Sequence, residues 1–247
     1  MMIYPDRVVS FESLAKLGLR RLYAIFQQTW VATLVCVLLR AIWIYLPPLV
    51  WLADIVGFLV TAGLIILFFS IAIYRIDALF QGKPVSFIEA WHIVVRRILR
   101  IYAVCLLLIA CVVLLFALGY WLIFLLFHLS GAWAALGFVL LTGLPIVIAF
   151  LAFYFTIPLI LVDNKPLWYA FYRSIELTQV SWLSVFMLYL GVVFILTLLL
   201  PHSRHVHWLL EHHLLVLFDW IVFAILVPLL MGISLLFMRN LERTLDK

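Results

Sequence analysis

Six long apolar runs constrain this chain more than any other feature. They lie at residues 29–46, 55–74, 101–127, 132–162, 182–200 and 214–238. Each holds roughly the 20 residues that an α-helix needs to cross a hydrocarbon core of about 30 Å. Hydrophobic residues make up 69% of the chain and charged residues only 11%, which is too little polar surface for a water-soluble globule. The sequence therefore predicts an all-α integral membrane protein with six transmembrane helices.

The basic residues predict the orientation of these helices. Six spans place both termini on one side of the membrane, and cytoplasmic loops collect Lys and Arg. With the N terminus inside, Arg40 and Arg204 are the basic residues on the far side. The cytoplasmic set is then Arg7, Lys16, Arg20, Arg21, Arg75, Lys83, Arg96, Arg97, Arg100, Lys165, Arg173, Arg239, Arg243 and Lys247. We expect a multi-pass protein of the cytoplasmic membrane with both termini cytoplasmic.

The formal net charge of +5 follows from the same pattern. The basic residues flank membrane spans, so they indicate orientation and attraction to anionic lipid headgroups. A nucleic-acid partner is not expected, because nucleic-acid binding proteins gather such residues in a patch or stripe on a soluble surface.

An internal repeat links the segments that precede the odd-numbered spans. "VSFESLAKLGLRRLYAIF" (9–26) and "VSFIEAWHIVVRRILRIY" (85–102) align without a gap, and "GKPVSF" and "NKPLWY" share their Lys-Pro pair. We interpret residues 1–247 as one membrane domain with internal repeats near 9–80, 85–160 and 164–240. The alternative is accidental similarity, because amphipathic helices that enter a membrane resemble one another for physical reasons.

Each repeated segment has the features of a helix start. Ser86 and Glu89 have the spacing of a capping box, and Pro166 suits a first helical position. In the third copy an apolar stripe follows the i, i+3, i+4, i+7 pattern through Trp168, Phe171, Tyr172 and Ile175. The predicted fold is therefore three transmembrane hairpins, each preceded by a cytoplasmic amphipathic helix at the membrane interface.

These interfacial helices carry the candidate lipid-binding residues. Ala170, Ser174 and Thr178 form a line of small residues that permits close helix approach, and Arg173 beside it suits a lipid phosphate. The full set of headgroup candidates is Arg96, Arg97, Arg173 and Ser174. The alternative is that these residues serve only helix packing and topology.

Charged residues inside apolar runs need an explanation, because burying them in lipid is costly. Arg40 and Asp219 both fall in the outer leaflet of this topology, and we predict that they pair, with Asp54 as a competing partner for Arg40. Three alternatives remain open: a structural ion pair, a polar cavity for an ion or headgroup, and snorkelling of the two side chains without partners. Arg75 and Asp77 end the second apolar run, where we expect a solvated helix terminus.

The predicted external loop "PHSRHVHWLLEHH" concentrates histidine. His207 and Glu211 lie four residues apart, so a helix would place them on one face, and His205 could complete a metal site. Because the unperturbed pKa of histidine as a residue type is about 6.5, this cluster could alternatively sense pH. A loop resting at the headgroup level is the third reading.

The sequence holds none of the enzyme motifs that would suggest catalysis. It has no Walker A loop, no Gly-x-Gly-x-x-Gly motif opening a helix, and no acidic pair at a catalytic spacing. Cys36, Cys105 and Cys111 all lie in predicted spans, which argues against a disulfide framework. We expect a protein without enzymatic activity and without a cofactor.

One stretch resembles a known family. Pro158 through Val162, the turn at 163–165, and "YRSIELT" with Arg173, Ser174, Leu177 and Thr178 resemble the signature of the YciC-like inner-membrane proteins of Gram-negative bacteria. Wider relatives include the membrane domain beside some glycerophosphodiester phosphodiesterases. The chain departs from the family pattern in its short first external loop and its His-rich second one.

The resemblance implies a six-helix inner-membrane protein tied to envelope homeostasis, with no catalytic residues to carry over. The expected partners are membrane lipids, anionic phospholipid in particular, and a membrane-protein partner or a second copy of the chain. The rival function is a small transporter or lipid translocator, for which proline-interrupted helices and intramembrane charges are the usual signs. Its distinguishing feature would be a continuous polar path through the core.

Overall fold

The computed structural model describes residues 10–45, 51–126, 137–199 and 227–245. Within these ranges every regular element is helical, so the predicted all-α class is confirmed. Contacts divide the chain into two compact units. Unit 1 comprises Met1–Ile98 and Leu183–Lys247, and unit 2 comprises Leu99–Trp182.

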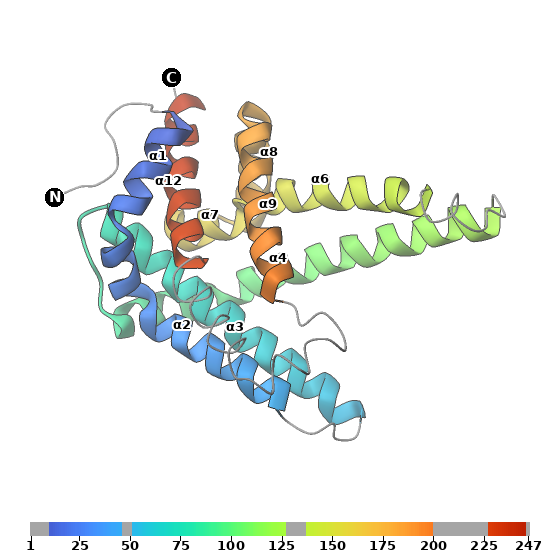
Figure 1. Ribbon diagram of the computed structural model, residues 1–247, viewed down its shortest axis with the longest axis horizontal. Coiled ribbons are helices and arrows are strands. Elements are labelled where there is room, and N and C mark those ends of the chain that lie inside the picture. Colours follow the sequence, from blue (N-terminus) through green and yellow to red (C-terminus); the bar gives the residue numbers. More distant parts are fainter. Residues whose placement is uncertain (1–9, 46–50, 127–136, 200–226, 246–247) are drawn as a thin grey trace. The chain divides into compact units, whose positions relative to one another are not determined.

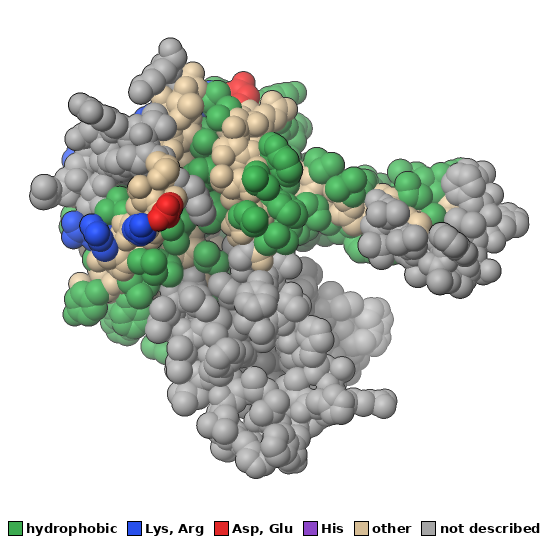
Figure 2. Space-filling view, turned by 45° about the horizontal axis from the view of Figure 1, so that its top comes forward, with side chains coloured by type: hydrophobic (Ala, Val, Ile, Leu, Met, Phe, Trp, Pro, Cys, Tyr) green, Lys and Arg blue, Asp and Glu red, His purple; other side chains and the backbone are tan. Residues whose placement is uncertain are grey.

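Long apolar helices indicate a membrane protein. In the described ranges three helical stretches are long and apolar enough to cross a membrane: Val60–Phe80, Phe87–Ile123 and Leu141–Asp163. Leu22–Cys36 is a shorter apolar stretch of the helix Leu22–Tyr45. Hydrophobic side chains cover much of the described surface in Figure 2, with Lys, Arg, Asp and Glu in few places. The count of six spans and their arrangement in hairpins stay predictions.

Unit 1 is built around two long helices that lie side by side, α2 (Leu22–Tyr45) and α3 (Trp51–Phe80) (Figure 1). The amphipathic helix α1 (Phe11–Arg20) packs on α12 (Val227–Leu245), which also contacts α2 and α3. Gly18 permits this approach, because a Cβ atom there would lie 2.8 Å from Ile233 Cγ1.

The second amphipathic segment differs from the prediction of a separate interfacial helix. It forms the first turns of one continuous helix, α4 (Phe87–Tyr120), which runs on into the π-helical stretch η1 (Trp121–Leu126). From Phe87 to Leu118 the sequence contains no Gly or Pro, so no residue in this stretch weakens or breaks the backbone ladder. By contrast, α1 ends before Arg21, which has φ −103° and ψ 7°.

Unit 2 continues with η2 (Val139–Gly143), α6 (Leu144–Phe153), α7 (Thr156–Asp163) and α8 (Leu167–Val180). Helix α8 packs on both α6 and α7. The predicted turn at 163–165 is present, with Asn164 in the left-handed conformation at φ 52° and ψ 31°. After Ser181, α9 (Trp182–Leu199) begins within the fifth predicted span.

The helix starts follow the predicted capping chemistry. Ser86 and Glu89 form the expected capping box, since the Glu89 N–H donates to Ser86 Oγ at 3.2 Å and the Ser86 N–H donates to Glu89 Oε2 at 2.9 Å. Ser10 caps α1 by accepting from the Ser13 N–H. Pro166 lies one position earlier than predicted, as the N-cap of α8 rather than its first residue.

Candidate functional site

The predicted fourth span, 132–162, is interrupted in unit 2 between α6 and α7. Pro158 accounts for the break, because it lacks an N–H and its ring would clash with the carbonyl of Tyr154, four residues earlier. Helix α6 ends at Phe153 and α7 restarts at Thr156. The restart places Pro158 in the first turn of α7, where a backbone N–H is not needed.

Two hydroxyl groups of α8 bind the backbone groups at this break. In an unbroken helix the Phe155 N–H would donate to the Leu151 carbonyl. Here the Phe155 N–H donates to Ser174 Oγ at 3.1 Å, and the Leu151 carbonyl accepts from Thr178 Oγ1 at 3.0 Å. Leu151 also accepts from the Tyr154 N–H at 3.2 Å. The line of small residues on α8 therefore stabilises an interrupted helix.

The buried face of α8 is not the aromatic stripe singled out in the sequence. Ala170, Ser174, Leu177 and Thr178 are the buried residues of this helix. Trp168 and Tyr172 are exposed, together with Tyr169. Exposed aromatic side chains of this kind suit the headgroup level of a membrane.

A second exposed pattern runs along the first turns of α4. Ile88, Val95 and Leu99 are exposed apolar residues, and their spacing places them on one face of the helix. Arg96 and Arg100, four residues apart, form an exposed basic line next to them. This combination is typical of a helix at a lipid interface, with the apolar line in the acyl region and the cations at the phosphates.

The first repeat exposes the corresponding positions. Leu19 and Tyr23 align with Val95 and Leu99, and all four are exposed. Arg20 aligns with Arg96 and is exposed as well. Two separate segments thus place a cation and a pair of apolar residues at the same relative positions.

The structure places the four headgroup candidates in different settings. Arg96 is exposed, whereas Arg97 is half-buried with its guanidinium carbon 6.0 Å from the centre of the Tyr74 ring. Arg173 forms an ion pair with Glu176 at 3.1 Å, and its side chain is 18% exposed. Ser174 is fully buried against Phe155, which removes it from the headgroup candidates. Arg96 therefore has the setting that best fits a lipid phosphate.

The expectation for the end of the second apolar run is wrong. Asp77 is buried rather than solvated, because α12 packs on this part of unit 1. Its Oδ1 lies 3.6 Å from Arg239 Nε, and Gln81 Nε2 donates to its Oδ2 at 2.5 Å. Arg75 is half-buried and donates to the Gln28 carbonyl at 2.5 Å and to the Val85 carbonyl at 3.4 Å.

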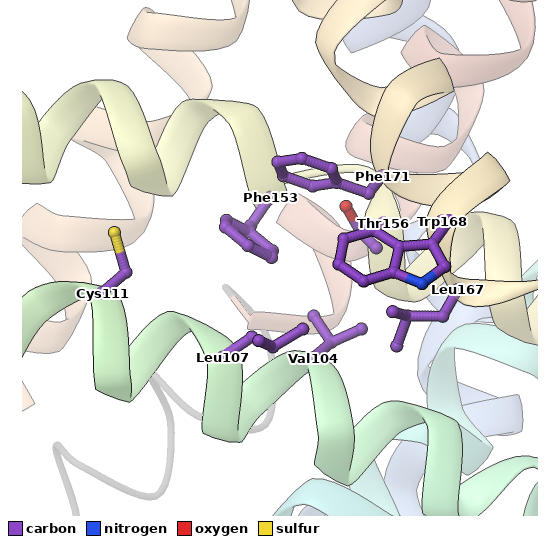
Figure 3. Close-up of a pocket in the computed structure, with 8 residues that line it drawn as sticks. All are labelled: Val104, Leu107, Cys111, Phe153, Thr156, Leu167, Trp168 and Phe171. Atoms are coloured by element: carbon purple, nitrogen blue, oxygen red, sulfur yellow. The ribbon is translucent and has the colours of Figure 1, made fainter.

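A cavity of about 250 Å³ lies within unit 2 next to the helix break (Figure 3). Its walls come from α4, α6, α7 and α8, and its lining residues are Val104, Leu107, Cys111, Phe153, Thr156, Leu167, Trp168 and Phe171. The rings of Phe153 and Phe171 contact each other in this lining, with centres 4.7 Å apart and planes tilted by 40°. The cavity can accept an apolar group, whereas it offers few partners to a polar one.

Two cations lie close in sequence to this lining. Arg100, one turn before Val104 on α4, is exposed and its Nη1 donates to Asn164 Oδ1 at 3.2 Å. Lys165, two residues before Leu167, has its Nζ 4.9 Å from the centre of the Tyr169 ring. Arg100 therefore contacts the turn between α7 and α8, in which Lys165 directly follows Asn164.

Several predicted site residues cannot be placed. Asp219 and the candidate metal ligands His205, His207 and Glu211 lie outside the described residues. Arg40 lies in α2, but its side chain is outside the description, so the Arg40–Asp219 pair stays a prediction. Among the described residues no group of three or more His, Cys, Asp or Glu side chains could hold a metal ion.

The sequence did not indicate the cavity, the place of Thr156 in its lining, or the contact between Arg100 and the turn that holds Lys165. A signal for the helix break was present, since Pro158 lies inside an apolar run. The cavity itself depends on where α4 lies relative to α6, α7 and α8, which no local pattern encodes. Arg100 could have been selected by its i, i+4 spacing from Arg96.

Comparison with known proteins identifies no relative: no protein-family model, curated protein or solved structure matches this chain.

Proposed function

We propose that this chain is a non-enzymatic, multi-pass protein of the bacterial inner membrane, of the YciC-like type, that acts in envelope or membrane-lipid homeostasis by binding anionic phospholipid. The proposed topology has six transmembrane helices in three hairpins, with both termini in the cytoplasm. The asymmetry of the basic residues supports this orientation. The family assignment depends on the motif at 158–178.

One observation carries the lipid-binding function. At equivalent positions of two repeated segments, an exposed arginine lies beside exposed apolar residues: Arg20 with Leu19 and Tyr23, and Arg96 with Val95 and Leu99. A Lys or Arg near an anionic membrane surface contributes about 1 kcal/mol of attraction. Several such residues on one side of the membrane would enrich anionic lipid around the protein.

The transporter alternative is supported by the interrupted helix, because discontinuous helices form the ion sites of many transporters. In unit 2, however, hydroxyl groups of α8 already bind the Phe155 N–H and the Leu151 carbonyl. A transported ion would need such backbone groups as ligands. We therefore favour lipid binding. A partner protein or a second copy of the chain could in addition contact the exposed aromatic residues of α8, Trp168, Tyr169 and Tyr172.

The test measures the preference of the reconstituted full chain for spin-labelled phosphatidylglycerol over spin-labelled phosphatidylcholine. We expect the wild type to prefer phosphatidylglycerol, and Arg96→Gln to lower the relative association constant by about threefold to fivefold, as expected for about 1 kcal/mol.

Lys16→Gln provides the matched control, because Lys16 is exposed and already paired with Glu12. This control should leave the preference nearly unchanged. A wild type without preference for phosphatidylglycerol, or an Arg96→Gln variant that retains it in full, would contradict the proposed function.

A further inference from the structure

The volume of the cavity in unit 2 is too small for a whole drug-sized ligand but large enough for a segment of a longer one. At about 250 Å³ it is smaller than the roughly 300–1,000 Å³ of pockets that enclose whole small molecules. It is larger than a dry apolar cavity of about 150 Å³ that binds benzene. A segment of an extended hydrocarbon chain, entering from the surrounding lipid, fits both limits.

The lining contains one buried hydroxyl group, that of Thr156, which needs a hydrogen-bond partner. Thr156 Oγ1 is buried and has no hydrogen-bond partner within the described part of the chain. Six helical hydroxyls described here donate to the carbonyl four residues earlier: Thr29, Thr33, Ser70, Thr142, Thr178 and Thr244. An unsatisfied buried hydroxyl costs about 1–3 kcal/mol, so Thr156 favours an occupant that brings a hydrogen-bond acceptor.

The charged residues near the cavity indicate which headgroup the bound hydrocarbon chain carries. Arg100 is one helical turn from Val104, about 6 Å along the axis of α4, and Lys165 precedes the lining residue Leu167 by two positions. Asp163 supplies a carboxylate in the same turn, which leaves these three residues with one net positive charge. A phosphate attached to the hydrocarbon chain would be attracted to this position.

We infer that unit 2 binds one glycerophospholipid with an anionic headgroup. One acyl chain occupies the cavity, its ester carbonyl accepts a hydrogen bond from Thr156 Oγ1, and its phosphate lies near Arg100 and Lys165. This inference rests on the proposed function and narrows it from enrichment around the protein to one defined lipid site.

The experiment uses the full chain in nanodiscs and phosphatidylglycerol that carries a photoreactive diazirine in one acyl chain. Crosslinked peptides are mapped by mass spectrometry. Labelling of the cavity is expressed relative to labelling of the exposed apolar residues of α4, which report the surrounding lipid. In the wild type we expect the label at Cys111 and Phe153, which line the cavity.

Leu107→Trp fills the cavity, and Leu106→Trp is its matched control. Leu107 lines the cavity and is 40% exposed, whereas its neighbour Leu106 is 66% exposed and is not part of the lining. We expect Leu107→Trp to lower the relative labelling by about tenfold, since the site depends on a free apolar volume. Leu106→Trp should leave it unchanged.

Two further variants test the polar contacts without changing the size of the cavity. Thr156→Val, and Arg100→Gln combined with Lys165→Gln, should each lower the labelling by about twofold to tenfold, as expected for lost hydrogen bonds and charge-assisted contacts. Thr33→Val is the control for Thr156→Val, because the Thr33 hydroxyl already donates to the Thr29 carbonyl.

Two results would overturn the inference. One is equal labelling of the wild type and Leu107→Trp. The other is a photoreactive fatty acid that labels the cavity as strongly as the phospholipid and does not respond to loss of Arg100 and Lys165. In both cases a phosphatidylglycerol preference that depends on Arg96 would leave the proposed function standing. Absence of that preference as well would remove both.

Discussion

Replacing Arg239 with methionine is expected to lower the free energy of unfolding by about 3–5 kcal/mol, the range for removing one partner of a buried ion pair. The side chain of Asp77 is 3% exposed and that of Arg239 is 19% exposed. Without the guanidinium group, Asp77 would keep the hydrogen bond from Gln81 but lose its ion pair with Arg239. Thermal or denaturant unfolding of the protein in a constant detergent measures the loss.

The matched control is Lys16→Met. The Lys16–Glu12 pair is also an ion pair, but its side chains are 66% and 77% exposed, so we expect a change below about 1 kcal/mol. The double variant Asp77→Leu, Arg239→Met should recover part of the lost stability, because apolar residues often replace a buried pair at little cost. The bond from Arg239 Nη1 to Glu242 Oε2, at 2.8 Å, is still lost in this variant. Equal losses in Arg239→Met and Lys16→Met would contradict the role assigned to Asp77.

Ser174→Ala is expected to cost about 1–3 kcal/mol, because it removes the acceptor of a buried backbone N–H. Phe155, which donates this bond at 3.1 Å, is fully buried. Thr178→Val should cost less, since the Leu151 carbonyl would still accept from the Tyr154 N–H. The effects are measured by unfolding under the same conditions, with Thr33→Val as a control that leaves the helix break untouched.

A stricter test compares the cost of Ser174→Ala in the presence and in the absence of Pro158. In a Pro158→Ala background the helix can continue through 154–158, and the Phe155 N–H can donate to the Leu151 carbonyl. Ser174→Ala should then cost less than half of what it costs in the wild-type background. An equal cost in both backgrounds would show that Ser174 does not compensate for the break.

The sequence predicted best what short-range patterns control. The all-α class follows from apolar runs that have the length of membrane helices, and the capping box of Ser86 and Glu89 follows from spacing alone. The turn after Asp163 was also predictable, because a polar Asp-Asn-Lys sequence followed by Pro cannot continue a helix.

Packing between helices explains where the predictions differed. Asp77 ends an apolar run, and nothing near it in sequence indicates that Arg239, far along the chain, would bury it. The aromatic stripe of α8 has helical periodicity, but small residues on the opposite face allow a closer approach to α6 and α7 and are buried instead. Periodicity identified an amphipathic helix without showing which face packs on the protein.

The residues of the candidate site also differ in whether the sequence alone could predict them. The position of Arg96 before a predicted span made it a headgroup candidate, and the structure leaves its side chain exposed. The structural role of Ser174 could not be predicted, because it depends on a break in another helix, where Ser174 accepts from the Phe155 N–H. Thr156 is a candidate only because it lines a cavity and its hydroxyl has no hydrogen-bond partner among the described residues.

The most direct test of the central claim, selective binding of anionic phospholipid, is native mass spectrometry of the full chain released from its own membrane in a mild detergent. The proposed function predicts that the protein retains an anionic phospholipid in preference to the zwitterionic lipids around it. A protein that carries no lipid, or only zwitterionic lipid in proportion to its abundance in the membrane, would contradict it.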